Sequence, residues 1–281
     1  MNILLTGATG FLGSNILEDL SKNNLIYITV RKKKYINTKL KKYLYFKDMI
    51  DLNKKLKNIK VDAVIHCATH YVKDHDFKDL NKFAEANILF GNTILENLKT
   101  MNVKKFINFT TVWEDYNSIK NNSKNLYSVY KKSFSNIVDF YIKIYPNIKM
   151  YHLYISETFG SNDKRKKIIN VLKSNYKKNI FTKIVSKNLL LNLINVEDIV
   201  NAVKIILYKK VIPDKYILKN NKSILISKLI NEFNRINFRK IKVKWLSKKK
   251  IYEKINLHKT ILTWKPMKSN ISDIIQIIKN N

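Results

Sequence analysis

The chain has 281 residues, 45% of them hydrophobic, and a formal net charge of +33 from 54 Lys and Arg against 21 Asp and Glu. This length suits one large domain or a domain with a smaller lobe. Because no run of about 18 apolar residues occurs and no signal peptide opens the sequence, we expect a cytoplasmic protein without a membrane span. The single cysteine, Cys67, excludes an internal disulfide framework.

The positive charge is spread over every segment, among abundant Asn and Ile, and no nucleic-acid-binding motif accompanies it. We interpret the lysines as solvated faces produced by biased composition, and we expect no nucleic-acid partner. The same charge would still attract an anionic cofactor or a nucleotide-linked substrate.

Three glycines follow the first expected strand. Asn2–Thr6 is a short apolar run typical of a buried strand, and Ser14–Leu20 is expected to be helical. Between them, Gly7 permits a tight turn, Gly10 lets the backbone approach a pyrophosphate, and Gly13 lets the helix pack against the strand. The free N–H groups at the helix start would hold the phosphates. This stretch predicts a dinucleotide-binding site.

The second strand, expected at Leu25–Val30, ends where the cofactor is selected. An acid at this point binds the ribose 2′-OH of NAD, whereas a cation accommodates the 2′-phosphate of NADP. The chain has Arg31 and Lys32 here, followed by two more lysines. The sequence therefore favours NADP, with NAD as the less favoured alternative.

Strands and helices alternate through the first half of the chain. Further strands are expected at Tyr43–Phe46, Ala63–His66, Phe106–Phe109 and Met150–Ile155, and helices from about Asp51, at Phe77–Met101 and at Tyr127–Tyr145. This alternation predicts an α/β fold with a Rossmann-type, doubly wound parallel sheet.

The pattern loosens from Ser156. Expected there are helices at Lys164–Lys178, Val196–Lys209, Ile224–Phe233 and from Ser269, and strands at Leu189–Leu193, Tyr216–Leu218 and Ile241–Leu246. We therefore expect a Rossmann domain over 1–158, to which 187–210 returns, and a smaller mixed α/β substrate-binding lobe over 159–281.

A metal site is not expected. His66, His70 and His75 cluster in sequence, but they fall at a strand end and in a loop, without a supporting carboxylate pattern. His70 remains a candidate for facing a substrate.

Tyr127 and Lys131 stand four residues apart at the start of an expected helix, and hence on one face. A phenol with a pKa near 10 transfers protons poorly at neutral pH unless a neighbouring cation lowers its pKa, and Lys131 would be that cation. The spacing alone is common in a chain this rich in Tyr and Lys. The nearby Tyr130 and Lys132 could be mistaken for members of the pair.

The T-G-x-x-G-x-x-G motif at Thr6–Gly13, together with Asn87, Thr111, Tyr127 and Lys131 in this order, resembles the extended short-chain dehydrogenase/reductase family of nucleotide-sugar epimerases, dehydratases and reductases. The resemblance implies that these four residues form a catalytic tetrad. It also implies cofactor contacts from the glycine loop, the second-strand cations, an adenine-contacting pair and the turn under the cofactor: Gly7, Thr9, Gly10, Phe11, Leu12, Gly13, Arg31, Lys32, Asp48, Met49, Cys67, Ala68, Thr69, Tyr127 and Lys131. From the residues alone, Asp48 is also a candidate helix cap.

Two further stretches narrow the reaction that the resemblance implies. Dehydratases of the family carry an Asp-Glu pair directly after the catalytic Thr, but Val112 and Trp113 stand here, and Glu114 and Asp115 are displaced by two residues. The segment L-Y-I-S-E-T-F-G-S-N-D-K-R is similar to a subgroup that includes NADPH-dependent 4-ketoreductases of the CDP-abequose and CDP-paratose synthase type. It departs from that subgroup at three positions, Glu157, Phe159 and Ser161. The implied substrate contacts are His70, Val112, Trp113, Glu157, Lys164 and Arg165. Lys164 and Arg165 would bind the diphosphate; alternatively, they are solvated residues at the start of a helix.

The resemblance thus implies an NADPH-dependent reductase of a nucleotide-linked 4-keto-6-deoxyhexose, serving surface-polysaccharide synthesis. A 4-epimerase with tightly held NAD would use the same tetrad, and a non-catalytic dinucleotide sensor is an alternative of another class. Family members also pair two long helices into a dimeric four-helix bundle, so a homodimer through helices 77–101 and 127–145 is expected.

Overall fold

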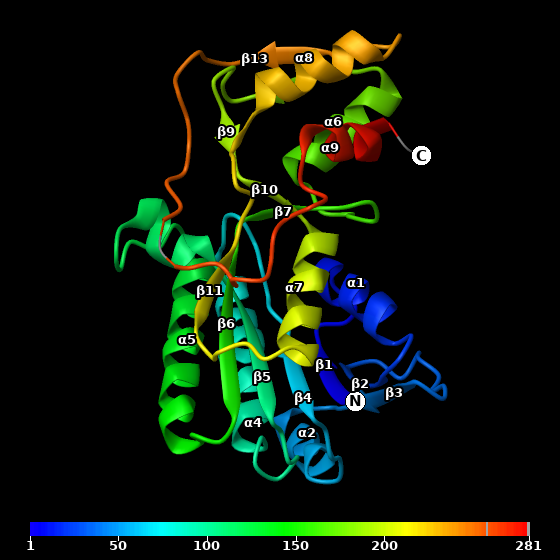
Figure 1. Ribbon diagram of the computed structural model, residues 1–281, viewed down its shortest axis with the longest axis vertical. Coiled ribbons are helices and arrows are strands. Elements are labelled where there is room, and N and C mark those ends of the chain that lie inside the picture. Colours follow the sequence, from blue (N-terminus) through cyan, green and yellow to red (C-terminus); the bar gives the residue numbers. More distant parts are fainter. Residues whose placement is uncertain (257, 280–281) are drawn as a thin grey trace.

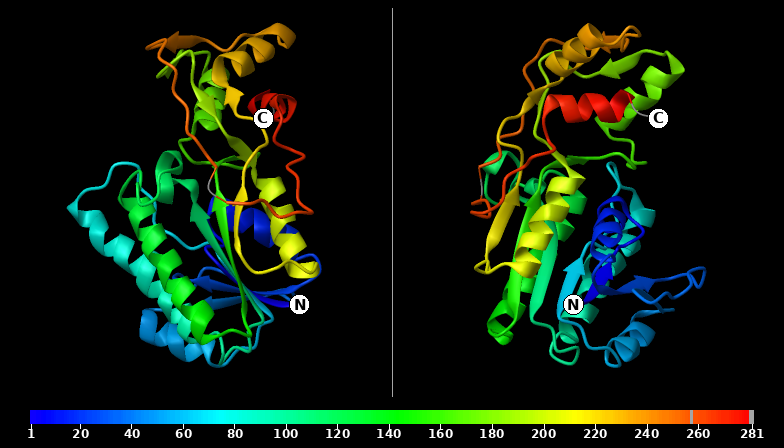
Figure 2. Two further views of the ribbon diagram at one scale, coloured as in Figure 1. Left: turned by 60° about the vertical axis from the view of Figure 1, so that its left-hand side comes forward. Right: turned by 45° about the vertical axis from the view of Figure 1, so that its right-hand side comes forward.

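The computed structural model describes residues 1–256 and 258–279 (Figures 1 and 2). Residues 257, 280 and 281, which the expected lobe over 159–281 includes, lie outside the described part. In the described part no helix is both long enough and apolar enough to cross a membrane.

A seven-stranded sheet, parallel throughout, forms the centre of the molecule, in the order β11-β6-β5-β4-β1-β2-β3. Its strands are β1 (Asn2–Thr6), β2 (Leu25–Val30), β3 (Lys41–Tyr45), β4 (Ala63–His66), β5 (Lys105–Thr111), β6 (Lys149–Ile155) and β11 (Lys215–Leu218). The strand order reverses between β1 and β4, which is where doubly wound sheets bind their ligands. The predicted fold class is confirmed.

Helices cover both faces of this sheet (Figure 1). Because side chains alternate along a strand, Ile3 packs in a cluster with α1 (Phe11–Leu20) and α7 (Val196–Tyr208), and Leu4 packs in the opposite cluster. The helices of the opposite cluster are α2 (Met49–Leu56), α4 (Phe90–Glu96) and α5 (Leu126–Ile144).

The expected single helix over 77–101 is wrong in detail. The structure has a 3-10 turn at Phe77–Asp79, α3 (Leu80–Ala84), a π-helical turn at Glu85–Leu89 and then α4, which ends at Glu96. Asn87 lies inside the π turn and is only 2% exposed. Single π turns within helices are frequent at functional sites.

A smaller lobe lies beyond the carboxyl ends of the central strands (Figure 1). It contains three two-stranded pairs: β7 (Glu157–Phe159) with β10 (Leu193–Asn195), β8 (Thr182–Ile184) with β13 (Val243–Trp245), and β9 (Leu190–Leu191) with β12 (Ile224–Leu225). Its helices are α6 (Ile168–Lys178), α8 (Ile226–Ile236) and α9 (Ile271–Lys279), and a separate core joins them.

The two halves of the molecule interleave. The chain leaves the lobe after β10, returns to the central sheet through α7 and β11, and enters the lobe again at β12. The returning stretch therefore runs from Val196 to Leu218, later at both ends than the expected 187–210. After β13 the chain runs back toward α5 (Figure 2), where Glu253 accepts a hydrogen bond from Trp113 Nε1 at 3.2 Å.

Candidate active site

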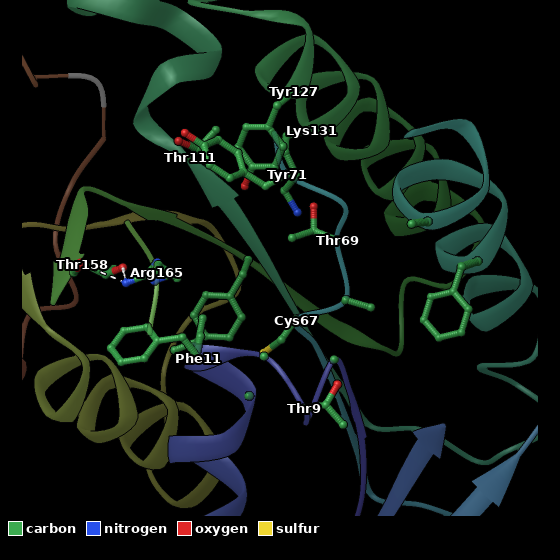
Figure 3. A pocket seen from close by; sticks show the side chains of 18 of the residues that line it. Thr9, Phe11, Cys67, Thr69, Tyr71, Thr111, Tyr127, Lys131, Thr158 and Arg165 are labelled. Atoms are coloured by element: carbon green, nitrogen blue, oxygen red, sulfur yellow. Dashed lines mark hydrogen bonds between the residues drawn. The ribbon is translucent and has the colours of Figure 1, made fainter. Parts of the chain in front are cut away.

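A cavity of about 1510 Å³ lies between the carboxyl ends of the central strands and the lobe (Figure 3). Most of the residues expected at the site line it: Gly7, Thr9, Gly10, Phe11, Leu12, Gly13, Arg31, Lys32, Met49, Cys67, Ala68, Thr69, Thr111, Trp113, Tyr127, Lys131, Glu157 and Arg165. The structure leaves Asp48, His70, Asn87, Val112 and Lys164 outside this lining.

The glycine loop requires its first and third glycines. Gly7 has a φ of +67°, and a Cβ on it would lie 2.6 Å from the backbone nitrogen of Ala68. A Cβ on Gly13 would lie 2.2 Å from the Gly7 carbonyl oxygen, so only glycine lets α1 start this close to β1. Gly10 caps α1 without a side-chain hydrogen bond, which leaves the N–H groups of the first turn to a phosphate. The loop therefore fits a dinucleotide pyrophosphate.

The far end of the cavity carries positive charge. Arg31 and Lys32, directly after β2, line the cavity together with Lys34 and Met49. Asp48 instead caps α2, because its Oδ1 accepts a hydrogen bond from the Asp51 N–H at 2.8 Å. The capping interpretation of Asp48 is the one that the structure supports.

The loop after β4 forms the floor of the cavity, and Asn87 holds it. Asn87 Oδ1 accepts hydrogen bonds from the Thr69 hydroxyl (3.1 Å) and the His70 N–H (2.6 Å), and its Nδ2 donates to the His70 carbonyl (3.1 Å). The π turn thus places Asn87 under the loop rather than in the cavity. The His70 ring points the other way, with Nε2 3.5 Å from Asp79 and its edge against Phe83, and His70 does not line the cavity; its substrate contact stays a prediction.

Thr111, Tyr127 and Lys131 all line the cavity (Figure 3). Thr111 ends β5, and α5 begins one residue before Tyr127, after a capping box between Asn125 and Ser128. Tyr127 and Lys131 therefore lie one turn apart on the same face, as their spacing predicts. Lys131 is 4% exposed.

The electrostatics of this centre differ from expectation. Burial lowers the pKa of Lys131 to about 8. Burial also raises the pKa of Tyr127, and the Glu114 carboxylate raises it further, whereas a hydrogen bond with Thr69 opposes the rise. The expected lowering of the Tyr127 pKa by Lys131 is therefore wrong for this structure, in which the pKa of Tyr127 is raised.

Aromatic and charged side chains surround this centre on the lobe side. The Tyr71 ring lies edge-on to Tyr127, with centroids 4.9 Å apart, and 6.3 Å from the ring of Trp113. Lys167 Nζ lies 5.1–5.3 Å from the ring centroids of Tyr71 and Trp113 and 3.0 Å from Glu157 Oε2. Sequence reasoning missed Tyr71 and Lys167, because each occupies an irregular segment without a recognisable spacing.

Arg165 reaches the cavity from the segment before α6, which begins at Ile168 and not at Lys164 as expected. Its guanidinium bonds both carboxylate oxygens of Asp163 at 2.7 Å and the Thr158 hydroxyl at 2.8 Å. Arg165 is therefore a fixed group and not part of a solvated helix start. Lys164 does not line the cavity.

Comparison with known proteins decides the family. The model of the NAD dependent epimerase/dehydratase family matches residues 3–218. The chain belongs to this family. It is thus an NAD(P)-dependent enzyme of the extended short-chain dehydrogenase/reductase type, as the motifs predict.

Relatives within the family act on nucleotide sugars. The chain is 29% identical over 212 residues to CDP-abequose synthase from Yersinia pseudotuberculosis, covering 72% of each chain. It is 31% identical over 251 residues to dTDP-D-glucose 4,6-dehydratase from Dictyostelium discoideum, but this covers only 57% of that enzyme. Among solved structures, UDP-glucuronic acid 4-epimerase from Bacillus cereus shares the fold with a TM-score of 0.82 at 18% identity, over 99% of this chain and 97% of that one.

Proposed function

We propose that the protein is an NADPH-dependent reductase that converts a nucleotide-linked 4-keto-6-deoxyhexose to the 4-hydroxy sugar. The observation that carries the proposal is that Tyr127, Lys131 and Thr111 line one cavity, while the two positions after Thr111, which hold the acid–base pair in the dehydratases, are Val112 and Trp113. Trp113 lines the cavity at one of those two positions, and Val112 is buried outside it. The CDP-abequose synthase relatives support the same class of substrate.

In this proposal bound NADPH supplies a hydride to C4 of the sugar. The Thr111 hydroxyl donates a hydrogen bond to the carbonyl oxygen, and Tyr127 transfers its proton to that oxygen as the carbon is reduced. The positive charge of Lys131 stabilises the phenolate that forms. Asn87 acts indirectly, since its hydrogen bonds hold the loop that carries Thr69 against Tyr127.

The cofactor preference follows from the cations beyond β2. Arg31, Lys32 and Lys34 line the end of the cavity where the adenosine ribose would lie, and a guanidinium can bind a 2′-phosphate through two hydrogen bonds. The glycine loop would hold the pyrophosphate. Both ends of the cavity thus fit NADP.

The substrate would enter from the lobe side. Arg165 is held in place by Asp163 and Thr158, so its remaining guanidinium edge fits a diphosphate oxygen. Trp113 and Tyr71 offer aromatic surfaces for the sugar, and the Glu157–Lys167 pair offers polar partners to its hydroxyl groups. The nucleoside would then lie toward the lobe.

A 4-epimerase with bound NAD is the second candidate, because solved 4-epimerases share the fold over nearly the whole chain. The relatives named CDP-abequose synthase are 24–29% identical to this chain, whereas these solved epimerases are 16–18% identical. We therefore rank reduction first.

The deciding experiment follows NADPH absorbance with CDP-, dTDP- and GDP-4-keto-6-deoxyglucose as substrates. One NADPH should be consumed for each sugar reduced, and NADH should be used less well. If the purified protein instead carries NAD and interconverts 4-epimers without consuming cofactor, the reductase proposal is wrong.

A further inference from the structure

A carboxylate of the C-terminal chain holds one wall of the cavity from behind. Trp113 lines the cavity, and its Nε1–H donates a hydrogen bond to Glu253 Oε2 at 3.2 Å. The other carboxylate oxygen of Glu253 forms an ion pair with Lys124, which also lines the cavity. Glu253 is not itself part of the lining. One carboxylate outside the cavity thus holds two groups of its wall.

The two partners of Glu253 also contact each other. Lys124 Nζ lies 4.2 Å from the centroid of the Trp113 ring, and an ammonium group is attracted by the negative face of an aromatic ring. In addition, the Lys124 backbone N–H donates a hydrogen bond to the Trp113 carbonyl oxygen at 3.1 Å. The three residues therefore form a closed set of contacts. A rotation of the indole would break its hydrogen bond and its contact with the ammonium together.

The C-terminal chain is fixed on the segment that carries Trp113. Asn117 Oδ1 accepts a hydrogen bond from the Lys254 N–H at 3.2 Å, and the Ser118 hydroxyl donates one to the Lys254 carbonyl oxygen at 3.0 Å. Ser118 Oγ also accepts a hydrogen bond from the Asn256 N–H at 2.9 Å. Asn117 and Ser118 have positive φ angles, of 58° and 61°, which residues other than glycine adopt only rarely. Such strained backbone persists where surrounding contacts fix it, and it clusters at functional sites.

Two other carboxylates of this region already have cation partners. Glu157 pairs with Lys167 at 3.0 Å, and Asp115 pairs with Lys132 at 2.5 Å. Neither carboxylate could replace Glu253 without giving up its own ion pair. In the described part of the chain, the hydrogen bond of the indole is the one to Glu253.

We propose that Glu253 is a positioning residue for the substrate site, which fixes the Trp113 indole and the Lys124 ammonium as one wall against which the nucleotide sugar binds. This inference rests on the proposed function, in which Trp113 offers an aromatic surface to the sugar. Because Trp113 lies on the lobe side of the cavity, loss of Glu253 should weaken binding of the sugar and leave binding of NADPH unchanged. The C-terminal chain would thus tune substrate affinity from outside the cavity.

The first test is steady-state kinetics of Glu253→Ala with a nucleotide-linked 4-keto-6-deoxyhexose that the enzyme reduces. The KM for this sugar should rise by about 3- to 10-fold, the value of one ordinary hydrogen bond, while kcat changes by less than about 2-fold. A variant that merely folded less well would lose active enzyme and hence kcat, without a change in KM. Glu253→Gln keeps an acceptor for the indole and should restore part of the wild-type KM. Glu232→Ala, which removes a carboxylate paired with Arg235 on α8, is the control and should keep the wild-type KM.

A second readout does not depend on the sugar substrate. The chain has three tryptophans, and quenching of their fluorescence by acrylamide reports how accessible the indoles are. Quenching should increase in Glu253→Ala, because the Trp113 indole is released. The increase should be absent when the same substitution is made in Trp113→Phe, which keeps an aromatic ring but has no N–H donor.

The two readouts separate this inference from the proposed function. If no nucleotide sugar is reduced but the quenching depends on Glu253 and Trp113 as described, the proposed function fails and the positioning of the indole stands. If a sugar is reduced and folded Glu253→Ala has the wild-type KM, the proposal is overturned, whatever its fluorescence. Quenching that stays at the wild-type level in Glu253→Ala also overturns it.

Discussion

The guanidinium of Arg165 stacks on the ring of Phe11, with its Cζ 4.1 Å from the ring centroid. Phe11 belongs to the first turn of α1, beside the glycine loop, whereas Arg165 comes from the chain that leads into the lobe. The contact therefore joins the proposed pyrophosphate site to the proposed substrate site (Figure 3). The side chain of Asp163, which holds Arg165 from behind, is completely buried.

Arg165→Ala should raise the KM for the nucleotide sugar by about 10- to 100-fold, the value of one charge-assisted hydrogen bond to a diphosphate. Steady-state kinetics at saturating NADPH would measure this change. Arg239→Ala is the matched control, because Arg239 stacks on Tyr176 at 5.0 Å outside the cavity, and its KM should match the wild type. Equal KM values for the two variants would remove Arg165 from the substrate site.

Arg31→Asp should reverse the order of cofactor preference. One lost charge-assisted contact is worth about 1.5–3 kcal/mol, so the dissociation constant of NADPH should rise far more than that of NADH. Fluorescence titration with both cofactors would show the difference. Lys22→Asp makes the same charge change at an exposed position outside the cavity lining and should affect neither selectivity nor turnover. Equal weakening of NADPH and NADH binding in Arg31→Asp would contradict the NADP assignment.

Tyr127→Phe removes one hydroxyl and little packing. Turnover should fall by about 100- to 10,000-fold, the usual contribution of a general acid, while the fold and NADPH affinity survive. Single-turnover kinetics and circular dichroism would separate these effects. Tyr130→Phe keeps the ring that stacks on Phe83 and should retain near wild-type turnover. An active Tyr127→Phe with an inactive Tyr130→Phe would mean that the other tyrosine is the acid.

The outward face of α5 carries apolar side chains whose exposure to water is unfavourable. Val129, Phe140 and Ile144 are exposed at helical spacing, and Phe140 is 58% exposed. A two-fold partner would bury this face, as a homodimer through α5 and the α3–α4 segment requires. Phe140→Asp should therefore convert a dimer to monomers in light scattering, whereas Phe238→Asp, at an exposed site on the lobe, should not. A wild-type monomer at micromolar concentration would contradict the dimer.

Asp198 at the start of α7 anchors the C-terminal chain. Its carboxylate accepts hydrogen bonds from the Met267 and Lys268 N–H groups at 2.7–3.1 Å and from the Ser269 hydroxyl at 2.6 Å. Asp198→Ala leaves these donors without a partner and should lower the free energy of unfolding by about 2–4 kcal/mol. Urea denaturation would measure the loss, and the exposed neighbour variant Glu197→Ala should change it by less than about 0.5 kcal/mol. A small effect at Asp198 would show that the tail docks by other contacts.

The sequence predicted the features that are set by residue spacing. These are the central strands, the glycine turn and the shared helix face of Tyr127 and Lys131, because hydrophobic period and backbone conformation are properties of neighbouring residues. The π turn at Asn87 and the orientation of His70 depend on hydrogen bonds between that turn and the loop after β4, seventeen residues away. The direction of the Tyr127 pKa shift depends on desolvation and on Glu114, which the fold brings near it, so no motif predicts it.

The return of α7 and β11 to the central sheet constrains how the protein is made. While the ribosome is still translating the lobe, the nascent chain has neither the helix that covers Ile16 and Leu20 nor the strand that closes the β6 edge. A product that stops at residue 158 would expose both, and an open apolar face beside an unpaired strand edge favours aggregation. The dinucleotide-binding half should therefore complete its folding only after Leu218 has emerged. Premature termination in the lobe would damage this half too, although its glycine loop lies at the N-terminus.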